Sequence, residues 1–105
     1  MGVLNRARAS EWTNNQIANA IYKAEGGAKA KVPYGILSVK VKNEAEARRV
    51  CINTIHNNHI RFTKQNKYTD FIEFLGSRYA PVSAHKLNKF WVRNVKYQLA
   101  KIKWN

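Results

Sequence analysis

The sequence feature that most constrains the fold is a helical stripe that leads into a carboxylate and then into two glycines. Thr13 and Gln16 form a T-x-x-Q capping box, which marks a helix start. The apolar residues after it recur at the spacing of one helix face and are Ile17, Ala18, Ala20, Ile21 and Ala24. Glu25 and a Gly-Gly pair come next, and glycine is typical of a helix C-terminus. These patterns predict a helix over residues 14 to 25 that ends on Glu25.

A carboxylate at the C-terminal end of a helix is in an unfavourable electrostatic position. The carbonyl groups there carry partial negative charge, so we expect the carboxyl group of Glu25 to hold its proton more tightly. The chain has six acidic residues against nineteen basic ones, and an acid placed in this way is a candidate general acid. The alternative is a surface carboxylate paired with Lys23, Lys29 or Lys31, which would lower the pKa of Glu25 and remove that role.

Two elements are predicted downstream of the Gly-Gly pair. Between residues 28 and 42 the helical period disappears. Pro33 breaks it and Gly35 permits a turn, so we predict a short extended or hairpin segment. Asn43 and Glu46 then form a second capping signature, and the stripe after them predicts a helix to about residue 59.

The second half of the chain predicts a loop and two further helices. Residues 60 to 68 are polar and basic, as is typical of a loop. Thr69 and Asp70 can cap a short helix that ends at Gly76. The last helix spans residues 84 to 103, with Leu87, Trp91, Val95, Leu99 and Ile102 on one side and Lys86, Lys89, Arg93, Lys96 and Lys103 on the other. The prediction is a mainly α chain of four or five helices, with the extended segment after the first main helix.

Length and composition indicate one small domain over residues 1 to 105. The chain is 45% hydrophobic, which is enough to bury a modest core without disulfides. The single cysteine, Cys51, excludes an internal disulfide and lies on an apolar stripe, so we expect a buried thiol. No cysteine pair or nearby carboxylate completes a ligand set around His56 and His59, so no metal and no cofactor are predicted.

The net charge of +13 predicts attraction to polyanions such as nucleic acid, anionic membranes or cell-wall polymers. No apolar run reaches the ~18 to 20 residues that span a bilayer, and residues 1 to 15 lack the apolar core of a signal peptide. We therefore expect a monomer without a membrane span or an export signal of its own, located in the cytoplasm until it is released.

Three short strings resemble one family. AIYKAEGG contains Glu25 and is followed by YGI at residues 34 to 36; FLGSRYAP covers residues 74 to 81, and LNKFWVRNVKYQL covers residues 87 to 99. In this order they resemble the lysozyme-like superfamily, in particular soluble lytic transglycosylases and phage or prophage muramidases. The chain departs from many relatives, which carry a serine soon after the glutamate and a G-L-M-Q string.

The resemblance implies a lysozyme-like α+β fold, a peptidoglycan substrate and a catalytic role for Glu25. It also implies substrate contacts, in which tyrosines hydrogen-bond the glutamate or stack on sugar rings; the residues concerned are Tyr34, Gly35, Ile36, Ser38 and Tyr79. The alternative for both tyrosines is a half-buried position in the core. A phage or prophage origin would bring the chain to the cell wall by holin release or on a virion.

The positions of the acidic residues in the sequence bear on whether the enzyme would use one carboxyl group or two. No Asp or Glu lies between Gly26 and Asn43, where lysozyme-type enzymes usually keep a second carboxylate, whereas most glycosidases use two carboxyl groups. The simplest mechanism is that of a lytic transglycosylase, which cuts the MurNAc-GlcNAc β-1,4 bond with Glu25 as acid and then as base. A hydrolytic variant, with Ser38 or another polar group holding a water, stays open.

Two other classes of function also fit the sequence. The segment from Lys86 to Trp104 is a basic helix with interleaved aromatic residues, and such a helix can follow a phosphate backbone. The chain would then be a basic helical nucleic-acid-binding protein. The other possibility is a lysozyme-like domain that binds glycan without cutting it. Trp91 lies on the apolar stripe of the last helix and is predicted to be a core residue.

Overall fold

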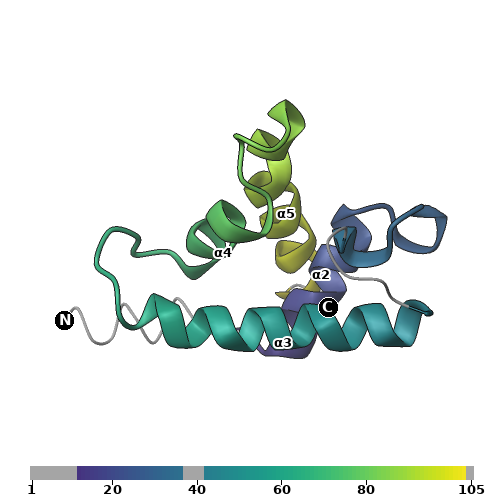
Figure 1. The fold of residues 1–105 in the computed structure, drawn as a ribbon, viewed down its shortest axis with the longest axis horizontal. Helices are drawn as coiled ribbons and strands as arrows, with labels where there is room; N and C mark the ends of the chain where they lie inside the picture. The colour runs from purple at the N-terminus through teal and green to yellow at the C-terminus, as the bar shows by residue number, and fades with distance from the viewer. Residues whose placement is uncertain (1–11, 37–41, 104–105) are drawn as a thin grey trace.

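The computed structural model describes residues 12–36 and 42–103, and this part of the chain is mainly helical, as predicted. The α-helices are α2 (Asn14–Ala24), α3 (Glu44–Phe62), α4 (Phe71–Tyr79) and α5 (Trp91–Lys103). Single 3-10 turns, η1 (Gly27–Lys29), η2 (Pro33–Gly35) and η3 (Lys86–Phe90), lie in the connections. Figure 1 shows the long α3 along one side of the molecule, with α4 and α5 on the same side of it. The helix α2 packs against both α3 and α5.

The helix starts follow the local capping signals. Thr13 Oγ1 accepts a hydrogen bond from the backbone N–H of Gln16 at 3.0 Å, and the Gln16 side chain accepts one from the N–H of Thr13 at 2.9 Å. The side chains of Asn43 and Asp70 cap α3 and α4, where they accept from the backbone N–H groups three residues later at 2.9 and 3.1 Å. Each cap satisfies backbone donors that have no partner inside the helix. The predicted N-termini of these three helices are confirmed.

The predicted loop at residues 60 to 68 begins too early, because α3 continues to Phe62. Phe62 is 2% exposed, and its ring packs against those of Phe71 and Phe74 at 5.6 and 5.5 Å between centroids. Burial of a large aromatic side chain stabilises the fold by about 1.5–3 kcal/mol. This gain favours a helix that continues to Phe62, although the neighbouring residues are polar. The last turn of α3 therefore exists because of α4.

The prediction that Gly76 ends its helix is wrong, because Gly76 lies inside α4, which continues to Tyr79. A Cβ atom at this position would lie 2.6 Å from Cγ2 of Val92 and 3.0 Å from Cε3 of Trp91. The glycine allows α4 and α5 to approach closely and is not a helix stop.

The last helix is also shorter than predicted. The turn η3 occupies residues 86 to 90, and α5 begins at Trp91. Leu87 was expected on the apolar stripe, but its side chain is 57% exposed, because a 3-10 turn does not follow the period of an α-helix. Trp91, Val95 and Leu99 are buried as the stripe predicted.

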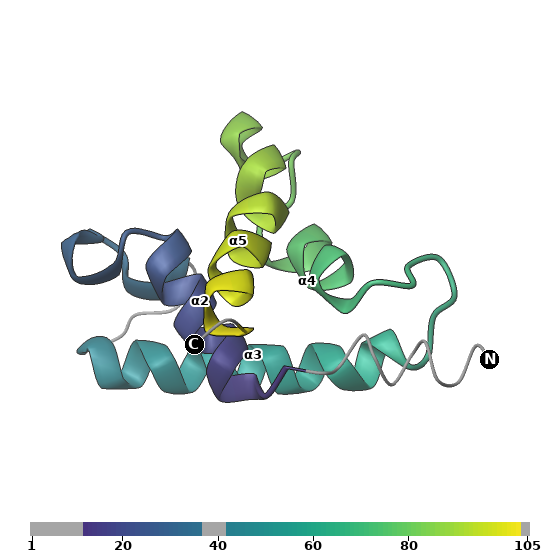
Figure 2. The ribbon, with the colours of Figure 1, turned by 180° about the vertical axis from the view of Figure 1, so that it is seen from behind.

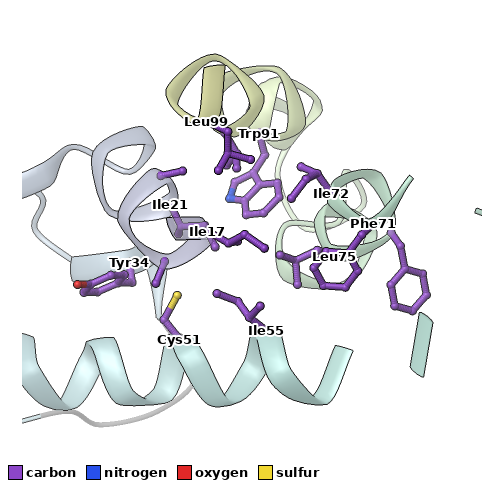
Figure 3. Packing of buried hydrophobic residues seen from close by; sticks show 14 of the residues in the cluster. Ile17, Ile21, Tyr34, Cys51, Ile55, Phe71, Ile72, Leu75, Trp91 and Leu99 are labelled. Atoms are coloured by element: carbon purple, nitrogen blue, oxygen red, sulfur yellow. The ribbon is translucent and has the colours of Figure 1, made fainter. Parts of the chain in front are cut away.

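One hydrophobic cluster joins all four helices (Figure 3). Ile17 and Ile21 come from α2, and Leu75 comes from α4; none of the three has exposed surface. Cys51 from α3 is fully buried and carries no disulfide, as expected. Burial raises the pKa of its thiol to about 11, which favours the protonated form.

The turns η1 and η2, which follow α2, lie beside the C-terminal end of this helix (Figure 2). Residues 27–35 form the turns η1 and η2, and no strand occurs in the described residues, so a hairpin is not seen there. Residues 37–41 of the predicted extended segment lie outside the described part. No helix in residues 12–36 or 42–103 combines the length and the apolar character that crossing a membrane requires.

Candidate functional site

Glu25 occupies the C-cap position of α2, where the sequence predicted the helix to end. Its backbone N–H donates to the carbonyl of Ile21 at 2.9 Å, so Glu25 is fixed to the last turn. The side chain is half-buried and lines a cavity of about 250 Å³. The other lining residues are Val32, Gly35, Tyr79, Ala80 and Asn88. The C-terminal ends of α2 and α4 and the connections that follow them thus surround a single carboxyl group.

The indole of Trp91 holds the carboxyl group of Glu25. Its Nε1–H donates to Oε2 of Glu25 at 3.1 Å, across 66 residues of sequence. The indole is 6% exposed and stacks on the ring of Tyr79, with 5.2 Å between centroids and 27° between planes. Figure 3 shows the indole nitrogen directed toward α2. Trp91 is therefore a core residue, as predicted, and also a hydrogen-bond partner of Glu25.

The pKa of Glu25 is raised above its ordinary value. Burial of the carboxyl group is the main cause, and the hydrogen bond from Trp91 opposes it without reversing it. In the described part of the chain, the ion pairs are those of Lys96 with Asp70 and Glu73, and no lysine is paired with Glu25. The arrangement of a surface carboxylate paired with a lysine is therefore not observed.

The backbone of Gly35 lies against the carboxyl group of Glu25. A Cβ atom at this position would lie 2.5 Å from Oε2 and 2.8 Å from Cδ of Glu25. Its φ of +67° also lies in the left-handed region that favours glycine. The predicted site residue Gly35 thus lies in the cavity, and only a glycine fits there.

Tyr79 positions the turn that carries Gly35. Its hydroxyl donates to the backbone carbonyl of Tyr34 at 2.5 Å and lies 3.6 Å from Sγ of Cys51. Burial raises the pKa of Tyr79, which therefore stays protonated and can donate. Tyr79 lines the cavity next to Glu25, but the two partners of its hydroxyl, Tyr34 and Cys51, are not lining residues. Its hydroxyl donates to the turn, whereas the sequence predicted a hydrogen bond to Glu25 or stacking on a sugar ring.

The ring of Tyr34 occupies the core position, which is one of the two alternatives that the sequence left open. It is 3% exposed, packs against Tyr22 at 5.1 Å between centroids, and its hydroxyl accepts from the guanidinium of Arg48 at 3.1 Å. Tyr34 has a positive φ of +59° and does not line the Glu25 cavity, while its carbonyl accepts a hydrogen bond from the hydroxyl of Tyr79. The alternative of a core tyrosine describes Tyr34 better than a sugar contact does.

The remaining predicted contacts are Ile36 and Ser38. Ile36 is partly buried against the core cluster and is not among the cavity-lining residues. Ser38 lies outside the described residues.

A second cavity of about 520 Å³ adjoins the first and shares Ala80 and Asn88 with it. The side-chain amide of Asn88 donates to the carbonyl of Pro81 at 2.9 Å and so ties η3 to the connection after α4. The other residues that line this cavity are Tyr68, Glu73, Gly76, Ser77, Pro81, Val82, Lys89 and Val92. The first cavity is smaller than the ~300 to 1,000 Å³ of typical ligand pockets, but the two together extend well beyond Glu25.

Sequence reasoning missed Trp91 and Asn88 as site residues. A buried tryptophan needs a partner for its single N–H, and the chain contains only six acids. The sequence therefore indicated that Trp91 needs an acceptor, but it did not identify Glu25 as that acceptor. Nothing local to Asn88 indicates that it faces Glu25, because their proximity depends on the packing of α5 against α2.

Comparison of the chain with protein-family models, with curated proteins and with solved structures finds no match.

Proposed function

We propose that the protein is a peptidoglycan-cleaving muramidase of the lytic transglycosylase type, with Glu25 as its catalytic residue. The observation that carries the proposal is the half-buried carboxyl group of Glu25, with a raised pKa, in a cavity at the end of α2. A raised pKa favours the protonated carboxyl group, and this form can donate its proton to a leaving oxygen.

The lining of the cavity favours a mechanism with one carboxyl group. Glu25 is the only acid among the described residues that line it. Two-carboxylate glycosidases hold their second group about 5 to 9.5 Å from the first. A single glutamate can cleave the bond if the substrate supplies its own nucleophile.

In the proposed reaction, Glu25 first protonates the glycosidic oxygen, and the bond between that oxygen and C1 of the muramic residue breaks. The C6 hydroxyl of the same sugar then attacks C1 and closes an anhydro ring. Its proton passes to the carboxylate of Glu25, which restores the acid. No water is consumed, and no oxidant or other reactant is needed.

The surrounding residues have supporting roles in this proposal. Trp91 directs Oε2 of Glu25 by its hydrogen bond, and Gly35 leaves room for the carboxyl group. Tyr79 holds the turn that contains Gly35 through the carbonyl of Tyr34. Position is important because proton transfer requires the donor within hydrogen-bond reach of the leaving oxygen.

The test is a comparison of three proteins on purified peptidoglycan sacculi. Native protein, Glu25→Gln and Glu46→Gln are incubated with sacculi, and soluble muropeptides are identified by mass spectrometry. Glu46 is a matched control, because it lies in the first turn of α3 and does not line either cavity.

We expect anhydromuramyl products from the native protein and from Glu46→Gln, and none from Glu25→Gln. Reducing ends instead of anhydro products would show hydrolysis and refute the transglycosylase mechanism. No release of muropeptides by the native protein would refute the enzymatic proposal.

A further inference from the structure

The exposed side of α5 carries a continuous row of basic and aromatic side chains. Arg93, Tyr97 and Lys101 follow one another at four-residue spacing, which places them on one face of the helix. Lys89 and Phe90 of η3 precede them. We call these five residues the α5 stripe. Its cations are exposed, and the side chain of Tyr97 is 60% exposed. Figure 2 shows the backbone of α5 along its whole length.

Each aromatic ring of the stripe is paired with a cation. The Arg93 guanidinium lies 4.6 Å and the Lys89 ammonium 5.1 Å from the centroid of the Phe90 ring. The Lys101 ammonium lies 4.4 Å from the centroid of the Tyr97 ring. Cation–π contacts restrict long side chains that would otherwise move freely in solvent. The positive charges are therefore held next to the rings.

Within residues 12–36 and 42–103, no acid forms an ion pair with the α5 stripe. The residues of η3 and α5, from Lys86 to Lys103, include no Asp or Glu. The acids that face α5 from α4 and its cap, Asp70 and Glu73, contact Lys96, at 2.7 and 3.5 Å. Lys96 lies outside the stripe, so these acids leave the charge of the stripe uncompensated in a chain of net charge +13. A negatively charged partner complements this surface.

We propose that the α5 stripe binds single-stranded nucleic acid, independently of the Glu25 cavity. Two of its cations, Arg93 and Lys101, lie about 12 Å apart along α5 at 1.5 Å per residue, with Tyr97 halfway between them, and Lys89 precedes them in η3. They offer repeated contacts to a phosphate backbone. The exposed ring of Tyr97 provides a surface on which an unpaired base can stack, and this combination of cations and rings is typical of single-strand binding. Bases inside a duplex are not accessible to such a ring. The proposal goes beyond the glycosidase function and does not depend on it.

The test measures binding of a fluorescent oligodeoxythymidine of about 12 nucleotides, within the ~4 to 16 nucleotides of known single-strand sites, by anisotropy at several salt concentrations. The full chain is compared with Arg93→Gln/Lys101→Gln and with Arg49→Gln/Lys64→Gln. The second pair removes the same charge from exposed residues in α3 and just after it. Circular dichroism establishes that each variant is folded.

We expect the α5 pair to weaken binding at least tenfold and to reduce the salt slope by about 1.4, since each single-strand phosphate contact contributes about 0.7. The control pair should change the affinity about twofold or less. Equal loss in both pairs would mean that diffuse charge is responsible and would overturn the proposal.

A third variant, Tyr97→Leu, separates nucleic acid from other polyanions. It retains every charge and should weaken oligodeoxythymidine binding about fivefold or more, because stacking on a base is lost. Binding of inorganic polyphosphate, which has no bases, should change by about twofold or less, because Lys101 loses its contact with the ring but keeps its charge. If Tyr97→Leu leaves oligodeoxythymidine binding unchanged, the occupant is a phosphate polymer without bases, and the proposal of a nucleic-acid site is wrong.

Discussion

Replacement of Gly35 by alanine tests whether the Glu25 carboxyl group is held where the structure places it. The new Cβ atom would lie 2.5 Å from Oε2 of Glu25, so the carboxyl group has to move. Gly27→Ala is a matched control. Gly27 has a similar positive φ, +60°, but a Cβ atom added there would have Cε2 of Tyr22 as its nearest neighbour, at 3.8 Å, which is an ordinary contact.

The two variants share one cost and differ in another. Alanine in the left-handed conformation costs about 1–2 kcal/mol at either position. In Gly35→Ala, the displaced carboxyl group also leaves the buried indole N–H of Trp91 without its acceptor, which adds about 1–3 kcal/mol. We therefore expect Gly35→Ala to lower the free energy of unfolding by about 2–5 kcal/mol and Gly27→Ala by about 1–2 kcal/mol.

Urea unfolding followed by circular dichroism measures the two free energies by linear extrapolation. A carbon NMR titration of the Glu25 carboxyl group provides a second readout. Burial raises the pKa of Glu25 in the native protein, so displacement toward solvent should bring its pKa closer to the ordinary value in Gly35→Ala only. Equal losses of stability in both variants, with an unchanged Glu25 titration, would refute the contact between Gly35 and Glu25.

Two further substitutions test the causes of the pKa shifts of Glu25 and Asp70. Trp91→Phe removes the indole donor, which lowers the pKa of Glu25; its pKa should therefore rise further in an NMR titration, and an unchanged pKa would contradict the hydrogen bond. The pKa of Asp70 is lowered because hydrogen bonds from Lys96 and from backbone N–H groups outweigh the opposing effect of burial. The stability that Asp70 contributes is present above its unfolded-state pKa and is lost as the pH falls through its folded-state pKa. Asp70→Asn, which keeps the helix cap, should flatten the acid side of the stability profile in urea unfolding, by about 1 kcal/mol or less because the pair is solvent-exposed. An unchanged acid limb would show that this ion pair contributes nothing.

Local signals in the sequence predicted the helix starts well. The caps at Thr13, Asn43 and Asp70 are all present, because a cap joins residues three positions apart and needs no distant partner. The end of α2 at Glu25 was also predicted, since the glycines after it adopt positive φ for reasons contained in the same turn.

Signals that depend on a distant partner were misread. Gly76 was interpreted as a helix stop, whereas Val92 and Trp91 of α5 explain the absence of a Cβ atom there. The polar run after His59 was interpreted as a loop, whereas Phe62 continues α3 because α4 buries it. In each case the deciding contact comes from another helix, which a local pattern does not contain.

The candidate site also depends partly on local sequence and partly on contacts between distant residues. The sequence by itself placed a carboxyl group at the C-terminal end of a helix and excluded other acids from the segment after it. Only the tertiary structure decided that Trp91, 66 residues away, donates to Glu25, that Gly35 lies against it, and that burial raises its pKa. The physical reason is that a cap is satisfied within a few residues, whereas burial and the partner of a buried polar group are properties of the packed helices.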